Sequence, residues 1–338
     1  MRVAPCRENH LIGLDVGATK IAAGIGTTSG KILHRLTLPT IRKNPQHLME
    51  QITTVIQELK DFGMRGEHWK PKVGIGICGG VQFPSGVVSS PIALGWGQPV
   101  PLQETLSARS GLAVWVDNDV NAGAVGEMLW GGARGLKHFI YISVGTGVGG
   151  GIVINGEIYR GAHQAAGEIG HVTVDVHGRQ CACGNWGCLE ALAGGKSLAE
   201  AVSEEIKISR LGTSPLLEAI LHSGQEITTK DIFKGGEEGD SYCQEVIAAL
   251  GEYLAAAVAS LTNLLDPEKI IIGGGLTQTG DLLFSAVRAS LKKWRACLVD
   301  SSEIFSPAML GADTGIAGAM GIALLRSGDE KITNPHES

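Results

Sequence analysis

Two widely separated stretches of the chain share one pattern, in which an apolar run, a turn of small residues and a second apolar run follow one another. The first is "LIGLDVGATKIAAGI", which begins at residue 11, and the second is "YISVGTGVGGGIVI", which begins at residue 141. Apolar runs of this length broken by Gly and Thr predict β-strands joined by tight turns. Because the pattern occurs twice, we expect two α/β domains of related topology, with a ligand that meets both turns.

The segments around these hairpins predict the remaining layers of such domains. The run "PQHLMEQITTVIQELKDF" has apolar residues at helical spacing after Pro45, and "KVGIGICGG" reads as a buried strand that ends in glycines. Further on, the long helical run "QEVIAALGEYLAAAVASLTNLL" precedes the strand "KIIIGGGL", and residues 210–240 predict a connecting helical region. We place a smaller α/β domain at residues 1–121, completed by a helix around 314–327, and a larger one at 122–313.

Composition and charge narrow the class of partner. Lys and Arg number 28 against 34 Asp and Glu, so the net charge of −6 offers no basic surface for nucleic acid. The first residues, "MRVAPCRENH", do not form an export signal, and no run of 18 uncharged apolar residues occurs. We therefore expect a cytoplasmic protein that acts on small molecules and does not bind a membrane.

The two small-residue turns are candidate phosphate sites. "DVGATK" covers residues 15–20 and "GTGVGGG" covers 145–151, and the lack of Cβ atoms lets backbone N–H groups approach phosphate oxygens. Asp15 could hold Mg²⁺ through water, and Lys20 could offset phosphate charge. Each turn alone could equally be a hairpin without a ligand, but the pair favours phosphate. The chain has neither a P-loop pattern nor a complete dinucleotide fingerprint, which disfavours a dinucleotide site.

A cluster of carboxylates and carboxamides follows the apolar strand at 114–116 in "VWVDNDVNAG". It comprises Asp117, Asn118, Asp119 and Asn121. Such groups can hydrogen-bond several vicinal hydroxyls, and one carboxylate can accept a proton from an attacking hydroxyl. The alternative is an Asx-rich turn that caps the next helix. Both can hold at once, because one Asx can cap while its neighbour faces a substrate.

Three of the seven cysteines lie within the eight residues "CACGNWGC", ten residues after the stretch "GEIGH". His171, Cys181, Cys183 and Cys188 supply one imidazole and three thiolates, a set that Zn²⁺ binds as a closed structural site. A redox dithiol would favour C-x-x-C beside a helix start, which this spacing does not match. His177 is a rival fourth ligand, because it lies nearer to Cys181 in the sequence.

Two acidic residues flank this predicted zinc site, Glu168 before it and Glu190 after it. A zinc tether would fix both carboxylates on one wall of a pocket, and a ligating imidazole could donate from its second nitrogen to a substrate oxygen. Such a wall suits a polyol. The alternative is that both glutamates are solvated surface residues.

The chain resembles the ROK family of sugar kinases and sugar-responsive repressors, which belongs to the actin/hexokinase-like superfamily of ATP-binding proteins. The resemblance covers nearly the whole chain and rests on motifs in family order. These motifs are "DVGATK", "DNDVNAGAVGE", "VGTGVGGGIVINGEIYRGAHQAAGEIGH", "CACGNWGCLE" and "IIIGGGL". It implies an α/β, ribonuclease H-like fold of two domains with a cleft between them.

The resemblance also implies roles for individual residues. Asp119 matches the general base that takes the proton from a sugar hydroxyl, usually the one on C6, as it attacks the γ-phosphate of ATP. Asn118, Glu168, His171 and Glu190 match the hexose-binding set, and His171 also matches a zinc ligand beside Cys181, Cys183 and Cys188. The nucleotide would be held by a first phosphate motif, a second phosphate motif and a turn that approaches the adenosine. In that order, these are Asp15, Gly17, Thr19 and Lys20; Gly145, Thr146 and Gly147; and Gly273, Gly274 and Gly275.

Membership of such a family leaves kinase and repressor open. The repressors carry a helix-turn-helix of several tens of residues, whereas about ten residues precede the first strand here, which favours an enzyme. Glucose is the expected sugar, with N-acetylmannosamine, N-acetylglucosamine, mannose, fructose and allose as alternatives. Ile92 stands where family glucokinases often carry Asn, and "CGGVQ" replaces the commoner "PGPVD". Relatives are commonly dimers or tetramers, so we expect a homodimer or homotetramer.

Overall fold

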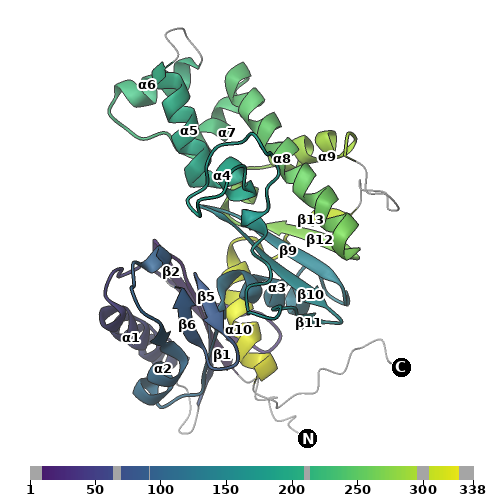
Figure 1. Cartoon of the computed structure of the whole chain (residues 1–338). Helices are drawn as coiled ribbons and strands as arrows, with labels where there is room; N and C mark the ends of the chain where they lie inside the picture. Colours follow the sequence, from purple (N-terminus) through teal and green to yellow (C-terminus); the bar gives the residue numbers. More distant parts are fainter. Residues whose placement is uncertain (1–9, 64–69, 91, 209–213, 295–303, 327–338) are drawn as a thin grey trace, which may run out of the picture. The chain divides into compact units, whose positions relative to one another are not determined.

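The computed structural model describes residues 10–63, 70–90, 92–208, 214–294 and 304–326. Contacts between residues divide the chain into two compact units, and each is built around a five-stranded sheet (Figure 1). The first unit takes its described residues from Met1–Gly135, Ile158–Ala166 and Asp313–Ser338. The second takes its described residues from Leu136–Glu157 and Gly167–Ala312.

The sheet of the first unit has the strand order β3-β2-β1-β4-β8. β1 (His10–Val16), β2 (Lys20–Thr27) and β3 (Ile32–Pro39) form an antiparallel meander, and the first two are the apolar runs predicted as strands on either side of a small-residue turn. β4 (Lys72–Ile77) and β8 (Val114–Asn118) run parallel to β1. The carboxyl ends of β1, β4 and β8 therefore meet at one edge of the sheet.

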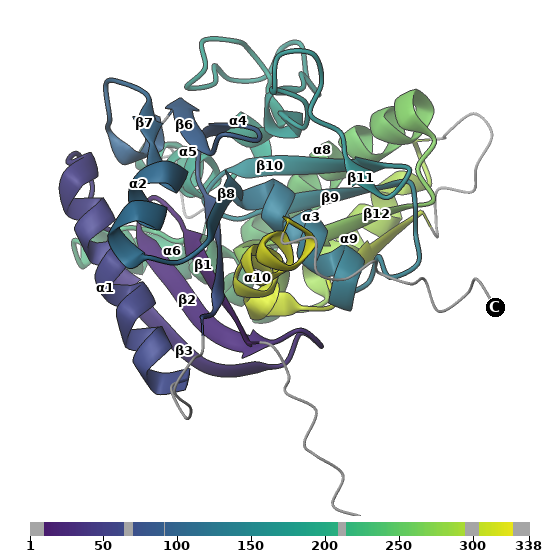
Figure 2. The ribbon, with the colours of Figure 1, turned by 90° about the horizontal axis from the view of Figure 1, so that it is seen from below.

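Helices cover both faces of this sheet, as Figure 2 shows for α1 and α10. α1 (Pro45–Gly63) and α2 (Leu102–Ser110) share one core with Ile12, Leu14 and Val16 of β1. α3 (Asp119–Trp130) and α10 (Thr314–Arg326) lie on the opposite face, where Leu11 packs against α10. Alternate residues of a strand point to opposite faces, so Asp15 shares the α10 face with Leu11 and Gly13.

Glycines let α10 approach the sheet backbone to backbone. A Cβ at Gly13 would collide with the carbonyl oxygen of Ile316, and one at Gly74 would collide with that of Ala319. A small antiparallel sheet flanks this unit, with β5 (Gly80–Gln82), β6 (Val87–Ser90) and β7 (Val100–Pro101). The turn of 3₁₀ helix η1 (Ile92–Leu94) begins at Ile92.

The sheet of the second unit repeats this plan with the order β11-β10-β9-β12-β13. β9 (Phe139–Val144) and β10 (Val148–Ile154) form the antiparallel hairpin, and β11 (Glu157–Ile158) follows at the edge. β12 (Lys269–Gly273) and β13 (Phe305–Pro307) run parallel to β9. The two units therefore share one topology, which confirms the prediction drawn from the repeated hairpin pattern.

The helices of the second unit pack into a core with β9 and β12, and α8 (Ser241–Leu265) has buried residues from Tyr242 to Thr262. Among the described residues, α8 is the one helix with the length and apolar composition of a membrane span, but 61% of its apolar window is buried. That burial is typical of a core helix. The remaining elements are α4 (Leu189–Ala193), α5 (Gly195–Ile208), α6 (Pro215–His222), α7 (Thr229–Glu237), α8 (Ser241–Leu265), α9 (Leu282–Leu291), η2 (Ile169–His171), η3 (Gly275–Gln278) and η4 (Gly311–Asp313).

The predicted domain ranges 1–121 and 122–313 divide the chain differently from these compact units. A boundary at residue 121 falls inside α3, which packs along α10 because Gly126 and Gly318 allow close backbone approach. Residues 158–166 also belong to the first unit by their contacts. Both differences arise from contacts between residues far apart in the sequence.

Candidate active site

Two carboxylates and one thiol meet at the carboxyl ends of the parallel strands in the first unit. Asp15 lies near the end of β1, Cys78 follows β4, and Asp119 begins α3 after β8. Burial, and next the charge of Asp119, raise the pKa of Asp15 to about 7, while Lys20 acts in the opposite direction. Burial, and next the charges of Asp119 and Asp15, raise the pKa of the Cys78 thiol to about 12. This edge therefore concentrates negative charge, which a divalent cation would relieve.

The raised pKa of Asp15 makes stability depend on pH in a definite direction. Its folded value of about 7 exceeds its ordinary value of 3.8, so between these values the folded chain keeps a proton that the unfolded chain has lost. Asp15 therefore costs stability as pH rises from about 4 to 7. We expect Asp15→Asn to stabilise the metal-free protein by about 1 to 3 kcal/mol at pH 8 and by less at pH 5. Urea unfolding with EDTA at both pH values measures this, and an equal gain at both would contradict it.

Asn118 caps α3 and also touches Asp119. Its Oδ1 accepts hydrogen bonds from the backbone N–H groups of Val120 (2.9 Å) and Asn121 (3.1 Å). Its Nδ2 donates to Asp119 Oδ1 at 3.0 Å and to the carbonyl oxygen of Gly79 at 3.2 Å. The capping interpretation thus holds for Asn118, and the cap fixes the position from which Asp119 projects.

The Asp117 side chain forms an ion pair with Arg160, which the sequence did not suggest. Its carboxylate accepts two hydrogen bonds from Arg160, at 2.8 Å from Nη1 to Oδ1 and 2.5 Å from Nη2 to Oδ2. The Asp117 side chain is 6% exposed and that of Arg160 is 16% exposed. The Asp117 carboxylate is therefore committed to its ion pair with Arg160.

The first candidate phosphate turn is a tight hairpin with exposed side chains at its tip. The N–H of Gly17 donates to the carbonyl oxygen of Lys20 at 3.0 Å, and Thr40 Oγ1 donates to the carbonyl oxygen of Gly17 at 2.8 Å. Thr19 and Lys20 are both exposed. The Asp15 carboxylate lies against Gly315 in the first turn of α10, where a side chain would collide with it. Gly315 is not among the site residues predicted from the sequence.

Backbone hydrogen bonds from the first residues of α5 fix the second candidate phosphate turn. The carbonyl oxygen of Gly145 accepts from the N–H of Gly195 at 2.8 Å, and that of Thr146 accepts from the N–H of Lys196 at 3.0 Å. The N–H of Gly145 donates to the carbonyl oxygen of Gly147 at 2.9 Å. These bonds fix the turn and leave Thr146 exposed at its tip.

The glycine turn at 273–275 lies beside the second phosphate turn, because β12 pairs with β9. Gly274 has φ of 95° and sits against the backbone of Val144, where any side chain would clash. An ideal Cβ on Gly145 would lie 3.8 Å from the backbone nitrogen of Gly275. Two of the predicted nucleotide motifs, which are 125 or more residues apart in the sequence, are therefore neighbours in the second unit.

The two glutamates of the predicted acidic wall, Glu168 and Glu190, both lie in the second unit, and the Glu168 side chain is 67% exposed. Glu190 Oε2 accepts from the N–H of Val148 at 3.0 Å and fills the space that a side chain at Gly147 would need. Gly170, in η2, would bring a Cβ within 3.4 Å of the Glu190 Cβ. Glu168 directly precedes η2 and His171 ends it, and Glu168 Oε2 lies 4.0 Å from His171 Nε2. Glu190 thus links this wall to the second phosphate turn.

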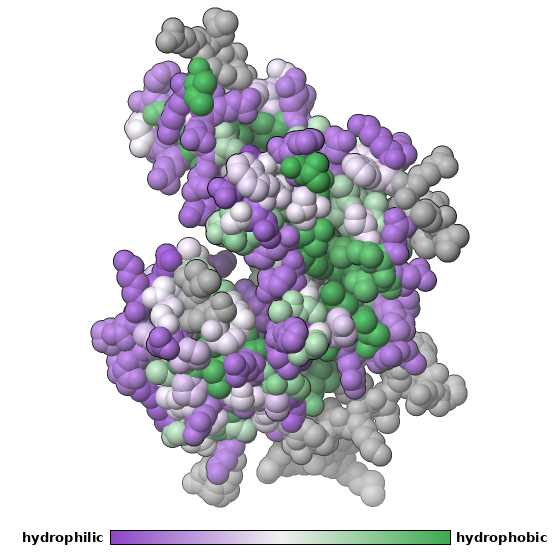
Figure 3. All heavy atoms as spheres, viewed as in Figure 1, coloured by the Kyte–Doolittle hydropathy of each residue, from purple (hydrophilic) through white to green (hydrophobic). Residues whose placement is uncertain are grey.

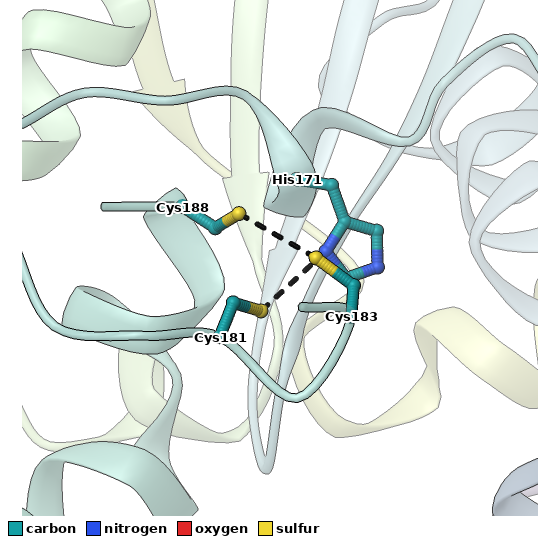
Figure 4. Close-up of side chains that lie close together, drawn as sticks. All are labelled: His171, Cys181, Cys183 and Cys188. Atoms are coloured by element: carbon teal, nitrogen blue, oxygen red, sulfur yellow. Dashed lines mark hydrogen bonds between the residues drawn. The ribbon is translucent and has the colours of Figure 1, made fainter. Parts of the chain in front are cut away.

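The four residues expected to bind zinc lie together in the same unit (Figure 4). One donor atom from each lies within 4.8 Å of the others; the four residues are His171, Cys181, Cys183 and Cys188. The sulfur atoms of Cys183 and Cys188 are 3.7 Å apart, and Cys181 Sγ is 3.8 Å from His171 Nδ1.

These distances fit a tetrahedral zinc site. Zn–S bonds of about 2.3 Å place two sulfur ligands about 3.8 Å apart. Because Nδ1 of His171 faces the thiols, its Nε2 is directed to the Glu168 side, as the ligand-and-donor role requires. His177 is described by the structure and is not one of the four.

The duplicated sheet, with an antiparallel hairpin leading each copy and glycine turns at the strand ends, defines the actin/hexokinase-like class of α/β proteins. Solved structures agree. A ROK family glucokinase from Streptomyces griseus, in complex with glucose and AMPPNP, superposes with a TM-score of 0.80 at 30% identity and covers 94% of this chain and 100% of that one.

Sequence comparison gives the family. The ROK family model matches residues 11–326, so the chain belongs to the ROK family. A glucokinase of Halalkalibacterium halodurans is 36% identical over 319 residues, covering 92% of this chain and 94% of the relative. A putative xylose repressor of Caldicellulosiruptor is 31% identical over 291 residues, covering 84% of this chain and 70% of the relative.

Proposed function

We propose that the protein is an ATP-dependent glucokinase, which transfers the γ-phosphoryl group of ATP to the 6-hydroxyl of glucose. The observation that carries this is the position of Asp119, fixed by the Asn118 cap at the edge where Asp15 also lies. The match to a glucokinase over nearly the full length of both chains supports the same assignment.

In the proposed reaction, Asp119 accepts the proton of the sugar 6-hydroxyl as that oxygen attacks the γ-phosphorus. A bond forms between this oxygen and phosphorus while the bond to the β-phosphate oxygen breaks, which yields ADP and the sugar 6-phosphate. Little covalent work falls to the protein, because phosphoryl transfer needs mainly in-line positioning and charge neutralisation. A general base of this kind contributes about 10²- to 10⁴-fold to the rate.

The nucleotide contacts follow from the three glycine-rich turns. We assign the phosphates to the turns at 15–20 and 145–147, and the adenosine to the turn at 273–275. Mg²⁺ bound to ATP would neutralise developing charge on the phosphates, and Asp15 would hold it through water. Lys20 is exposed beside this site and supplies a further positive charge.

We assign the sugar contacts to Asn118 and to Glu168, His171 and Glu190, as the family resemblance implies. Carboxylates and an imidazole N–H suit the alternating donors and acceptors of a hexose. Structural Zn²⁺ on His171 and the three cysteines would fix the orientation of His171 and the position of the loop that carries Glu168.

A panel assay tests the substrate. We expect Mg·ATP to release ADP several-fold faster with glucose than with mannose, fructose, allose, N-acetylglucosamine or N-acetylmannosamine, when ADP is measured with pyruvate kinase and lactate dehydrogenase. A preference for one of the other sugars would keep the kinase and replace glucose. The absence of any sugar-stimulated ADP release would contradict the kinase assignment. It would favour a sugar-responsive regulator, in line with the similarity to a putative xylose repressor.

The cellular location and the oligomeric state of the protein stay predictions. An enzyme that uses ATP and an intracellular sugar belongs in the cytoplasm.

Apolar side chains cluster at the surface over the end of α8, where Leu264 is 77% exposed and Leu265 is 38% exposed (Figure 3). Such a patch suits a contact with a second copy of the chain, in keeping with a homodimer or homotetramer.

A further inference from the structure

We propose that Arg160 is a positioning residue for the reaction, which acts through Asp117 to set the direction of Asp119. The inference rests on the proposed function, because it takes Asp119 as the general base. Arg160 itself does not need to touch the sugar or ATP.

Hydrogen bonds connect Arg160 to Asp119 in consecutive steps. Arg160 holds both oxygens of Asp117, and Asp117 Oδ1 accepts from the backbone N–H of Asn118 at 2.8 Å. The same oxygen accepts from Asn121 Nδ2 at 3.4 Å. Asn118 Nδ2 then donates to Asp119 Oδ1 at 3.0 Å. The position of the Asp119 carboxylate thus depends on the turn at residues 117–119, whose backbone is hydrogen-bonded to the Asp117 carboxylate.

Arg160 is itself held in place by its surroundings. Its guanidinium carbon lies 3.9 Å from the centre of the Phe83 ring, and Arg326 approaches the same ring at 4.2 Å. The N–H of Phe83 donates to Gln164 Oε1 at 3.2 Å, and the N–H of Ala166 donates to the carbonyl oxygen of Arg160 at 3.1 Å. A planar guanidinium that stacks on a ring and grips a carboxylate with two donors has little freedom to move.

Charge gives a second reason for the pair. Asp117 lies two residues before Asp119, and its side chain is almost fully buried. An unpaired carboxylate at this place would either draw in another cation or pull the turn toward solvent, because burial of an isolated charge is costly. Arg160 removes that tendency and leaves the turn in the geometry that presents Asp119.

The test compares Arg160→Met, Arg160→Lys, Asp117→Asn and the double variant Asp117→Asn/Arg160→Met with the wild-type protein. The matched control is Arg35→Met, because Arg35 also makes a two-donor pair, with Asp313 at 2.8 and 2.6 Å, but on the exposed surface of the same unit. Each variant is checked by circular dichroism and thermal unfolding, and assayed at 25 °C for kcat, for KM of ATP and for glucose Kd by calorimetry.

We expect Arg160→Met to lower kcat by about 10- to 100-fold and to weaken glucose binding about 3- to 10-fold through Asn118, with KM for ATP within twofold. Arg160→Lys should recover part of kcat. The double variant should be no slower than Arg160→Met, because both changes break one connection. Arg35→Met should keep kcat within twofold.

Three outcomes would overturn the proposal. The first is a folded Arg160→Met that melts earlier but keeps wild-type kcat and glucose Kd, since the pair would then serve stability alone. The second is a double variant whose loss is the product of the single losses, since Arg160 would then act independently of Asp117. The third is an equal loss in Arg35→Met. An inactive wild-type protein would refute the proposed function instead, and glucose Kd would still report on the Arg160–Asp117 connection.

Discussion

Replacing Asp119 with Asn is expected to lower kcat by about 10²- to 10⁴-fold while glucose Kd stays within about threefold. The amide cannot accept the proton of the 6-hydroxyl. It can still accept through Oδ1 the hydrogen bonds that Asp119 receives from Asn118 Nδ2 at 3.0 Å and from the N–H of Val120 at 3.0 Å. The substitution therefore removes the proposed base and keeps the local hydrogen bonds. Steady-state kinetics with calorimetry separates the two effects.

A matched control is Asp61→Asn, because Asp61 is an exposed carboxylate on α1 that accepts from Gln57 Nε2 at 2.7 Å. It should keep kcat within twofold. An Asp119→Asn variant with near-wild-type kcat would place the base elsewhere. A variant that loses glucose binding in proportion to kcat would make Asp119 a binding residue rather than a base.

Replacing Cys183 with Ser is expected to reduce bound zinc from about one ion per chain to almost none, and to weaken glucose binding by tenfold or more. Cys183 is the exposed member of the four, so its loss perturbs packing least and reports on ligation. Without the ion, the loop between His171 and Cys188 loses its tether, and Glu168 loses its fixed position. Elemental analysis of the dialysed protein and calorimetry with glucose measure the two effects.

Cys243→Ala is the control for this variant, because Cys243 is buried in the core of the second unit and lies outside the four-residue cluster. It should retain the metal and bind glucose normally. If Cys183→Ser kept its zinc, the metal site would be misassigned. If it lost zinc and bound glucose as tightly as wild type, the site would stabilise the loop without shaping the sugar wall.

Local sequence patterns predicted the elements that depend on nearby residues. The hairpin β1–β2 follows from two apolar runs with a small-residue turn between them, and α1 follows from helical spacing. Five apolar residues of α1 at that spacing are buried: Leu48, Ile52, Val55, Ile56 and Leu59. The cap by Asn118 and the gathering of His171 with three cysteines also involve residues within one short stretch. Side chains at such spacing have few ways to fold back on one another.

Contacts across long sequence separations were not predictable in this way. Arg160 pairs with Asp117 across 43 residues, and nothing in "YRG" distinguishes this arginine from a solvated one. Gly315 gives room to Asp15 from the opposite end of the chain, although the small residues of "GADTG", which lead from η4 into α10, could have suggested a close approach. The choice of His171 over His177 likewise depended on how the loop turns back, which spacing alone does not determine.

The most direct test of the central claim is the formation of glucose 6-phosphate from glucose and Mg·ATP, measured with glucose-6-phosphate dehydrogenase and NADP⁺ beside a parallel ADP assay. We expect one NADPH for each ADP released, both in the wild-type protein and, at a rate lowered about 10²- to 10⁴-fold, in Asp119→Asn. ADP release without glucose 6-phosphate, or no release at all with glucose, would contradict it.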